Sequence, residues 1–460
     1  MNEKIQIIFG LLGGLAVFIY GMNMMSECLQ KAAGDKMKSI LALLTKNPLL
    51  GVLAGALTTA VLQSSSATTV MAIGFVSAGL MNLPQAISII FGANIGTTMT
   101  AQIIAFKISD YIYVIIFIGF LISFVTKSEK VKSIGQTIFA FGLLFLGIET
   151  MGDVMKPLAS SPVFTDLIGR VAHIPVLGVA VGTVMTLVVQ SSSATIAVLQ
   201  NFASQPGPDG VTSILGLAGA IPILLGDNIG TTITALLASI GQSKDAKRTA
   251  VAHCIFNISG CFLFIWFVKP FAALIQNISP KGPEIEVISR QIANAHTVFN
   301  ITMTLIWVCL IKLMVKIVMT LIPDGKKGVE DPGSPIYLDE NIISQPAAAL
   351  QLVAKEIFRM SDQVRDILKK TIELVKNEEV KSIDGLKENG EQVERLGKCI
   401  TEYLAALFSS GSLTEQQAAQ TASLMCVLSD VERMGTLSVE MAECMLERSD
   451  RKYKYTPEAM

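Results

Sequence analysis

The sequence predicts an all-α protein in two parts, a polytopic membrane domain over residues 1–322 and a soluble three-helix bundle over residues 345–460, joined by a linker at 323–344. Of the 460 residues, 51% are hydrophobic and 16% charged, and the mean hydropathy is +0.55, whereas a soluble chain is about 25% charged. Charge is also uneven: residues 1–322 hold 19 Lys and Arg with 13 Asp and Glu, and the other 138 residues hold 17 and 24. These features exclude a single soluble enzyme, a disordered chain and a basic nucleic-acid-binding protein.

The apolar stretches predict helices that cross a lipid bilayer. The run from Ile5 to about Met25 is too long for the core of a signal peptide, so we expect a retained first helix. Lys312 and Lys316 lie one helical turn apart near the end of the last stretch, and the positive-inside rule places this end and the following tail in the cytoplasm. Further stretches recur at roughly 48–82, 84–106, 111–126, 134–151, 171–200, 211–240, 249–275 and 296–322. We therefore expect a multi-pass protein of the plasma or inner membrane.

An internal duplication organises the membrane domain. The hexapeptide Gln-Ser-Ser-Ser-Ala-Thr occurs at 63–68 and, 127 residues later, at 190–195. Each copy is followed by a second matching segment, Gly-Ala-Asn-Ile-Gly-Thr-Thr at 92–98 and Gly-Asp-Asn-Ile-Gly-Thr-Thr at 226–232. The residues before each hexapeptide keep the same register: Pro48, Gly51, Gly55 and Thr59 correspond to Pro175, Gly178, Gly182 and Thr186. The chain thus contains two homologous halves, about 5–125 and 132–240, with additional helices over 247–322.

The duplicated QSSS segments are the candidate site. Each places four hydrogen-bonding side chains inside an apolar run, where every unsatisfied polar group costs several kcal/mol, so they must face protein or a water-filled cavity. Close helix packing explains the small-x-x-x-small glycines, but it does not require a glutamine followed by three hydroxyls. Paired polar breaks in two membrane halves are typical of a transporter site, where helix N-termini bind an anion and oxygens coordinate a small cation. Neither QSSS has a lysine or arginine nearby, which favours a neutral, dipole-lined pocket assisted by a bound cation.

With these motifs, the chain resembles the type II sodium–phosphate cotransporter family over about residues 5–320. The resemblance implies two inverted repeats, each with a re-entrant hairpin that carries QSSS, around one inorganic phosphate and the Na+ ions that drive it, with no organic cofactor. The duplication follows from the residues, whereas the inversion comes from the resemblance. Carried over, the substrate and sodium site is Gln63, Ser64, Ser65, Ser66, Gln190, Ser191, Ser192 and Ser193, with Asn94, Asn228, Thr97 and Thr231 in second rank.

Two positions in and after the repeats leave alternatives open. Asp227 replaces Ala93 of the first copy, and its carboxylate could serve a cation site or merely cap a helix. The pattern Ala-His-x-x-Phe-Asn-Ile occurs at 252–258 and 295–301, which places a histidine and an asparagine on one helix face. For these histidines we favour a structural interhelical hydrogen bond over a proton relay.

The tail predicts three amphipathic helices. Apolar residues with 3/4 spacing run from Leu350 to Leu374, a second periodic stretch covers about 380–408, and a capping box at Thr414 begins a third helix that reaches about Arg448. The segment Asp-Val-Glu-Arg-Met-Gly at 430–435 is similar to the third-helix pattern of PhoU-like domains. The tail therefore resembles a PhoU-like domain, which implies a phosphate-signalling partner in the cytoplasm. Asp362 and Asp366 have the spacing of that family's acidic metal ligands, although this spacing is more often a solvated helix face.

Taken together, the sequence predicts a secondary transporter that imports phosphate by sodium symport and alternating access, and not an enzyme. The motifs do not encode direction, so export on the same scaffold is an alternative, as is a phosphate sensor whose membrane half signals to the tail. An intramembrane serine hydrolase is disfavoured, because the chain has no Gly-x-Ser-x-Gly motif and no histidine near either QSSS in sequence.

Overall fold

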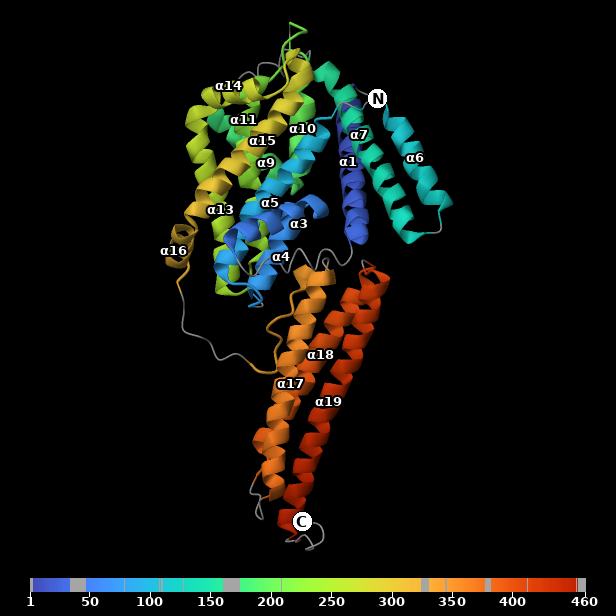
Figure 1. Ribbon diagram of the computed structural model, residues 1–460, viewed down its shortest axis with the longest axis vertical. Helices are drawn as coiled ribbons and strands as arrows, with labels where there is room; N and C mark the ends of the chain where they lie inside the picture. The colour runs from blue at the N-terminus through green and yellow to red at the C-terminus, as the bar shows by residue number, and fades with distance from the viewer. Residues whose placement is uncertain are drawn as a thin grey trace. The chain divides into compact units, whose positions relative to one another are not determined.

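The computed structural model is almost wholly helical and divides into two compact units, one of residues 1–76 and 81–323 and one built on residues 324–460 (Figure 1). The structure describes residues 3–33, 47–77, 79–106, 108, 111–126, 128–159, 174–207, 209–323, 331–343, 346–376, 382–411, 413–451 and 453.

The first unit contains the apolar helices. They are α1 (Glu3–Ala33), α3 (Pro48–Leu62), α4 (Ser65–Ser77), α5 (Leu83–Ile104), α6 (Ile112–Val125), α7 (Glu129–Ala159), α9 (Pro175–Val189), α10 (Ser192–Ala203), α11 (Gly216–Gly230), α12 (Thr232–Ala238), α13 (Lys244–Phe264), η3 (Ile265–Phe267), α14 (Val268–Ile278), α15 (Glu284–Cys309) and α16 (Ile311–Leu321). Within the described part of the chain, six helical segments are long and apolar enough to cross a membrane: Gln6–Leu29, Leu83–Ile104, Val131–Val154, Gly216–Ala238, Lys244–Ile278 and Glu284–Cys309. The prediction of a polytopic, all-α membrane domain is therefore confirmed.

The helix breaks lie at the QSSS segments. In the first half, Pro48 occupies the first turn of α3 and the helix ends at Gln63, whose φ of 51° is left-handed; Ser64 Oγ then accepts from Ala67 N at 3.2 Å. In the second half, α9 ends in the same way at Gln190, with φ 53°. Among the described residues these glutamines are the only non-glycine residues with positive φ. Each half thus interrupts its apolar stretch at the same residue.

The chain folds back at each break. The hydroxyl of Thr59 in α3 donates to that of Thr68 in α4 at 2.9 Å, and the hydroxyls of Thr186 and Thr195 lie 3.1 Å apart in the second half. Both pairs are nine residues apart in sequence, which a continuous helix would separate by about 13 Å. The two QSSS segments therefore lie at the tips of two helix–turn–helix units.

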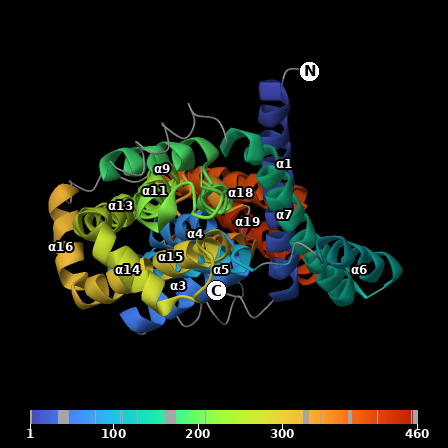
Figure 2. The ribbon, with the colours of Figure 1, turned by 90° about the horizontal axis from the view of Figure 1, so that it is seen from above.

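In each half, the helix before the break packs in parallel against the helix that carries the second motif. A Cβ on Gly55 of α3 would lie 2.1 Å from Ile89 O, and one on Gly92 of α5 would lie 1.9 Å from Val52 O. In the second half, α9 and α11 meet in the same way at Gly182 and Gly226, and Figure 2 shows these two helices side by side. Only glycine allows backbones to approach this closely.

Two pairs of helices that correspond in sequence run antiparallel to each other. The helices α1 and α7, which lead into the two halves, pack with Gly14 against Met151 and Gly21 against Leu144 (Figure 2). Similarly, in the pair α13 and α15, which carry the repeated His and Asn, Phe264 packs edge-to-face against Phe299 and Trp307 Nε1 donates to Ser259 Oγ at 3.0 Å. The two lead-in helices, and the two helices that carry the histidine pattern, therefore each form an antiparallel pair.

The second unit is a bundle of three helices, α17 (Pro346–Lys376), α18 (Asp384–Ser409) and α19 (Glu415–Asp450), as the sequence predicts. The predicted capping box is confirmed, because the side chains of Thr414 and Gln417 each accept from the other's backbone N–H.

The described part of the linker, 331–343 with the short helix η4 (Glu340–Ile342), lies against α17. The buried carboxylate of Glu356 accepts from the backbone N–H of Ile336 at 3.0 Å and of Tyr337 at 2.6 Å, and from Arg359 Nε at 2.6 Å. A stretch expected as a simple connection is thus fixed by a buried charge. Residues 324–330 and 344 of the expected linker lie outside the described residues.

The glycine contacts predict which small substitutions the membrane unit rejects. Gly55→Ala places a methyl group against the Ile89 carbonyl, which belongs to helix backbone and cannot rotate away, and overpacking of this kind costs about 1–3 kcal/mol. Gly13→Ala on α1 is the matched control, because its Cβ would meet nothing within 4 Å. We expect a lower thermal unfolding temperature in detergent for Gly55→Ala and an unchanged or higher one for Gly13→Ala. Equal stability of the two variants would contradict the packing.

Candidate functional site

At the first tip, Gln63 joins the break to the helix of the second motif. Its side chain is 7% exposed; Nε2 donates to Ala60 O at 2.5 Å and Oε1 accepts from Thr100 Oγ1 of α5 at 3.0 Å. Both ends of the amide are therefore bonded within the first half.

The second tip differs, because a carboxylate takes part. Gln190 is exposed, and the hydroxyl of Thr186 donates to Asp227 Oδ1 of α11 at 2.6 Å. Asp227 is fully buried, and its other oxygen, Oδ2, has no hydrogen-bond partner in the structure. The first half has Ala93 at this position. The two tips therefore share their backbone path but not their polar chemistry.

The serines lie at the N-termini of α4 and α10. Ser65, Ser192 and Ser193 are buried, and the other three serines are half-buried. Ser191 caps α10, since its Oγ accepts from Ala194 N at 3.3 Å, as Ser64 does for α4. The first N–H groups of a helix have no partner within the helix, and the helix dipole adds partial positive charge there. Each tip can thus offer hydroxyl and backbone donors to an anion.

The second-rank candidates bond mainly to their own helices. Asn94 donates to Ile90 O, Thr97 to Ala93 O and Thr231 to Asp227 O. Asn228 donates to Leu224 O, and its Oδ1 lies 3.3 Å from His296 Nε2, so the interhelical bond predicted for this histidine is present.

A single hydroxyl contact links a QSSS segment to the other half. Thr234 Oγ1 of α12 donates to Ser66 Oγ of α4 at 3.3 Å. Within the residues that the structure describes, no hydrogen bond joins the two QSSS segments to each other or to Asn94, Asn228, Thr97 or Thr231. The structure therefore brings the first half's tip to α12 but does not close all predicted residues into one bonded cluster.

Several polar residues that shape the tips were not predicted as site residues. They are Thr59, Thr68, Thr100, Thr186 and Thr195. Thr59 and Thr186, like Thr68 and Thr195, occupy matching positions in the two copies of the repeat. In the register of the second motif, Thr100 corresponds to Thr234. A hydroxyl kept in register within an apolar helix was therefore the signal that could have identified all five.

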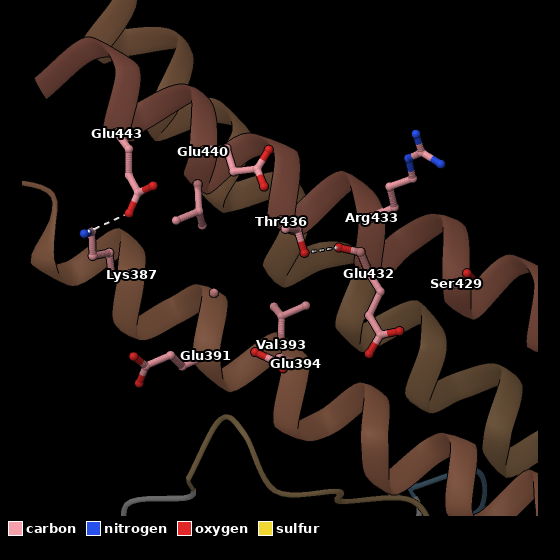
Figure 3. Close-up of a pocket in the computed structure, with 12 residues that line it drawn as sticks. Lys387, Glu391, Val393, Glu394, Ser429, Glu432, Arg433, Thr436, Glu440 and Glu443 are labelled. Atoms are coloured by element: carbon pink, nitrogen blue, oxygen red, sulfur yellow. Dashed lines mark hydrogen bonds and ion pairs between the residues drawn. The ribbon is translucent and has the colours of Figure 1, made fainter. Parts of the chain in front are cut away.

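The tail has its own groove, between α18 and α19, of about 590 Å³ (Figure 3). Five glutamates line it, and Lys387 Nζ pairs with Glu443 at 2.8 Å, which raises the pKa of Lys387. Partial burial, and then the charge of Glu394, raise the pKa of Glu432. The excess of negative charge makes this groove a poor receptor for phosphate.

The acidic pair predicted as low-rank metal ligands lies elsewhere on the tail. Asp362 is 41% exposed and pairs with Arg365 at 2.8 Å, and Asp366 is also exposed. Within the described residues, no group of three or more His, Cys, Asp or Glu side chains could hold a metal ion. The arrangement of Asp362 is that of a solvated helix face.

The difference between the two tips can be measured by removing one hydroxyl from each. Thr186→Val leaves the buried Asp227 carboxyl without its donor, at a cost of about 2–3 kcal/mol, whereas Thr59→Val breaks a bond between neutral hydroxyls that is worth about 1 kcal/mol. Thermal unfolding in detergent should therefore show the larger loss for Thr186→Val. An equal loss in the two variants would mean that the Asp227 contact contributes nothing to stability.

Comparisons with known proteins identify two families that the chain matches. The family model described as Na+/Pi-cotransporter matches residues 17–153 and 151–279, and that of the PhoU domain matches residues 357–445. No solved structure is significantly similar to the chain.

Three relatives illustrate the similarity. The uncharacterized protein YqeW of Bacillus subtilis is 35% identical over 263 residues, which cover 57% of this chain and 83% of that protein. YjbB of Salmonella typhimurium, whose name proposes export of inorganic phosphate, is 23% identical over 443 residues, 95% of this chain and 78% of that protein. Sodium-dependent phosphate transport protein 2B of Homo sapiens is 33% identical over 142 residues, 29% of this chain and 19% of that protein. The Na+/Pi-cotransporter model matches more than half of the chain. The chain therefore belongs to the Na+/Pi-cotransporter family, a family of phosphate transporters, and it carries a PhoU domain in its tail.

Proposed function

We propose that the chain moves inorganic phosphate across the membrane by sodium symport and alternating access, and that phosphate binds between the N-termini of α4 and α10. The observation that carries the proposal is the pair of QSSS segments, each placed at a helix N-terminus by a left-handed glutamine. The proposed ligands are Gln63, Gln190 and the serines at 64–66 and 191–193, with Asn94, Asn228, Thr97 and Thr231 as supporting groups.

Helix ends and hydroxyls supply the donors that such an anion needs. Backbone N–H groups and serine hydroxyls bind phosphate at helix N-termini in many proteins, without a basic side chain. The two arginines of this unit that the structure describes are engaged elsewhere: Arg248 pairs with Asp245 at 2.6 Å and donates to Ile322 O, and Arg290 donates to Gln102. Binding by dipoles allows phosphate to leave again, since it is not held by a fixed opposite charge.

Sodium would balance the charge of the anion. Asp227 is a buried carboxyl in a membrane-spanning segment, and its Oδ1 accepts from the hydroxyl of Thr186, which lies 3.1 Å from that of Thr195. Oxygen ligands of this kind suit a small hard cation, and the unpartnered Oδ2 of Asp227 leaves one oxygen for it. We assign the coupling ion to this side of the site.

We further propose that the halves are inverted repeats and that α3–α4 and α9–α10 are re-entrant hairpins. The antiparallel packing of α1 with α7 supports the inversion, because these helices lead into the two halves. An inverted pair gives each side of the membrane an equivalent hairpin, an arrangement that many alternating-access transporters use.

We further propose a direction of transport and the side of the membrane on which the tail lies. Sodium gradients usually point into the cell, so a symporter imports phosphate, and Lys312 and Lys316 favour a cytoplasmic tail that responds to phosphate through a signalling partner. Export is a second candidate, because the relatives named for export match 95% of the chain, tail included.

Transport into proteoliposomes tests the proposal. We expect uptake of radiolabelled phosphate to rise with an inward sodium gradient and to stop when potassium replaces sodium. Ser65→Ala and Ser192→Ala should abolish uptake, because each removes a donor from a tip, whereas Ser123→Ala on α6, where the hydroxyl bonds only to Phe120 O, should not. Cellular phosphate content decides direction, since overexpression of an importer raises it and overexpression of an exporter lowers it.

Two results would contradict the proposal in different ways. Phosphate uptake that is indifferent to the sodium gradient would remove the coupling while leaving the transport. Full activity of both serine variants would remove the QSSS segments from the site.

A further inference from the structure

The helix that follows the second break is tied to its neighbours by two consecutive amides. Gln200 of α10 is 1% exposed, and its Nε2 donates to Ala101 O of α5 at 3.1 Å and to Ser289 O of α15 at 2.8 Å. Asn201, the next residue, donates to Ile148 O of α7 at 2.9 Å. Three hydrogen bonds therefore connect α10 to three other helices.

The first half has no such donors at the equivalent positions. A shift of 127 residues relates Gln200 and Asn201 to Ile73 and Gly74 of α4, neither of which has a polar side chain. Ile73 is fully buried in an apolar cluster that includes Ala235 and Ala246.

The surroundings of Ile73 correspond to those of Gln200. Gln200 donates to the backbone oxygens of Ala101 and Ser289, and Ile73 packs in a cluster with the counterparts of both. Ala235 corresponds to Ala101 when the two copies of the second motif are aligned. Ala246 corresponds to Ser289 when the two copies of the histidine pattern are aligned. The same three-way junction thus occurs twice, once with hydrogen bonds and once with apolar contacts.

The two junctions differ in the free energy needed to separate the hairpin helix from its neighbours. Inside a membrane protein, a broken amide bond leaves polar groups without water, so separation of α10 from its neighbours is costly. Apolar side chains that separate within a lipid-like interior lose only packing contacts, because no hydrophobic driving force holds them together there. The hydroxyl bond between Thr234 and Ser66, at 3.3 Å, lies at the tip of α4 rather than at this junction.

We propose that Gln200 and Asn201 are positioning residues that anchor α10, and that α3–α4 is the hairpin that moves to admit or release phosphate. The anchor holds Ser192 and Ser193 in place while the first tip opens and closes against them. This inference rests on the proposed site between the tips, and it adds that sequence-equivalent hairpins have unequal roles.

Hydrogen exchange in the wild-type protein tests the difference directly. In nanodiscs without phosphate, we expect the amides of 69–76 in α4 to exchange at least about tenfold faster than those of 196–203 in α10, because three additional hydrogen bonds hold α10. Phosphate with sodium should slow the α4 amides and leave those of α10 within about twofold. Equal exchange in the two segments would overturn the inference, even if the protein transports phosphate.

A paired substitution tests the positioning role. Gln200→Ile with Asn201→Gly gives α10 the residues of the first half, and Ser204→Ala is the matched control, because its hydroxyl bonds only to Gln200 O of the same helix. We expect exchange in α10 to rise about tenfold in the paired variant and the KM for phosphate to rise by a similar factor, with the maximal rate within about twofold. The control should match the wild type.

The kinetic pattern separates this role from a structural one. A variant that is merely less well folded loses maximal rate at unchanged KM, and that result would overturn the inference. Failure of the proposed function is distinguishable, because wild-type protein would then transport no phosphate at all while the exchange rates of α4 and α10 still report which hairpin is held.

Discussion

The contact between backbones at the paired glycines determines the geometry of the membrane unit. Gly51 and Gly55 allow α3 to lie directly against α5, and the equivalent glycines do the same for α9 and α11. At the end of each contact, Gly96 packs on Thr59 and Gly230 on Thr186. These threonines hold the fold-back across each break, so the position of each QSSS tip depends on a close approach that a single methyl group would prevent.

Much of this architecture could be predicted from the sequence. The duplicated motifs predict two similar halves broken at Gln63 and Gln190, and the two glutamines do end their helices with the same backbone conformation. What the sequence could not predict is how identical residues differ in three dimensions. Thr100 donates to Gln63, whereas its counterpart Thr234 donates to Ser66, and Gln190 is left exposed.

The tail shows the same limit for a different reason. Its amphipathic spacing predicts three helices, and α17 to α19 follow that prediction. Glu356 lies in α17, where a glutamate in an amphipathic pattern indicates a solvated face, yet its carboxylate is buried beneath residues 331–343. Glu356 is buried by residues 331–343, which lie outside the helix. The periodicity of the helix alone therefore cannot predict this burial. Asp362, by contrast, is partly exposed and pairs with Arg365, and Asp366 is exposed.

The proposed phosphate site without basic side chains would explain how a membrane domain so poor in charge can bind an anion. Helix N-termini and hydroxyls bind phosphate with directional bonds, and a neighbouring cation near Asp227 would supply the balancing charge only when sodium is present. Coupling then follows from electrostatics, because each ion makes the site more favourable for the other. In the proposed mechanism, hydrogen bonds hold α10 in place, whereas α4 is packed only by apolar side chains at the equivalent junction. The two tips would therefore bind with similar groups but move differently.

Equilibrium binding of radiolabelled phosphate to the purified protein in nanodiscs tests the central claim most directly. We predict saturable binding that strengthens with sodium, disappears in Ser192→Ala and persists in Arg290→Gln, because serine hydroxyls and helix ends, and not basic side chains, hold the anion. Binding that survives Ser192→Ala but is lost in Arg290→Gln would contradict this account.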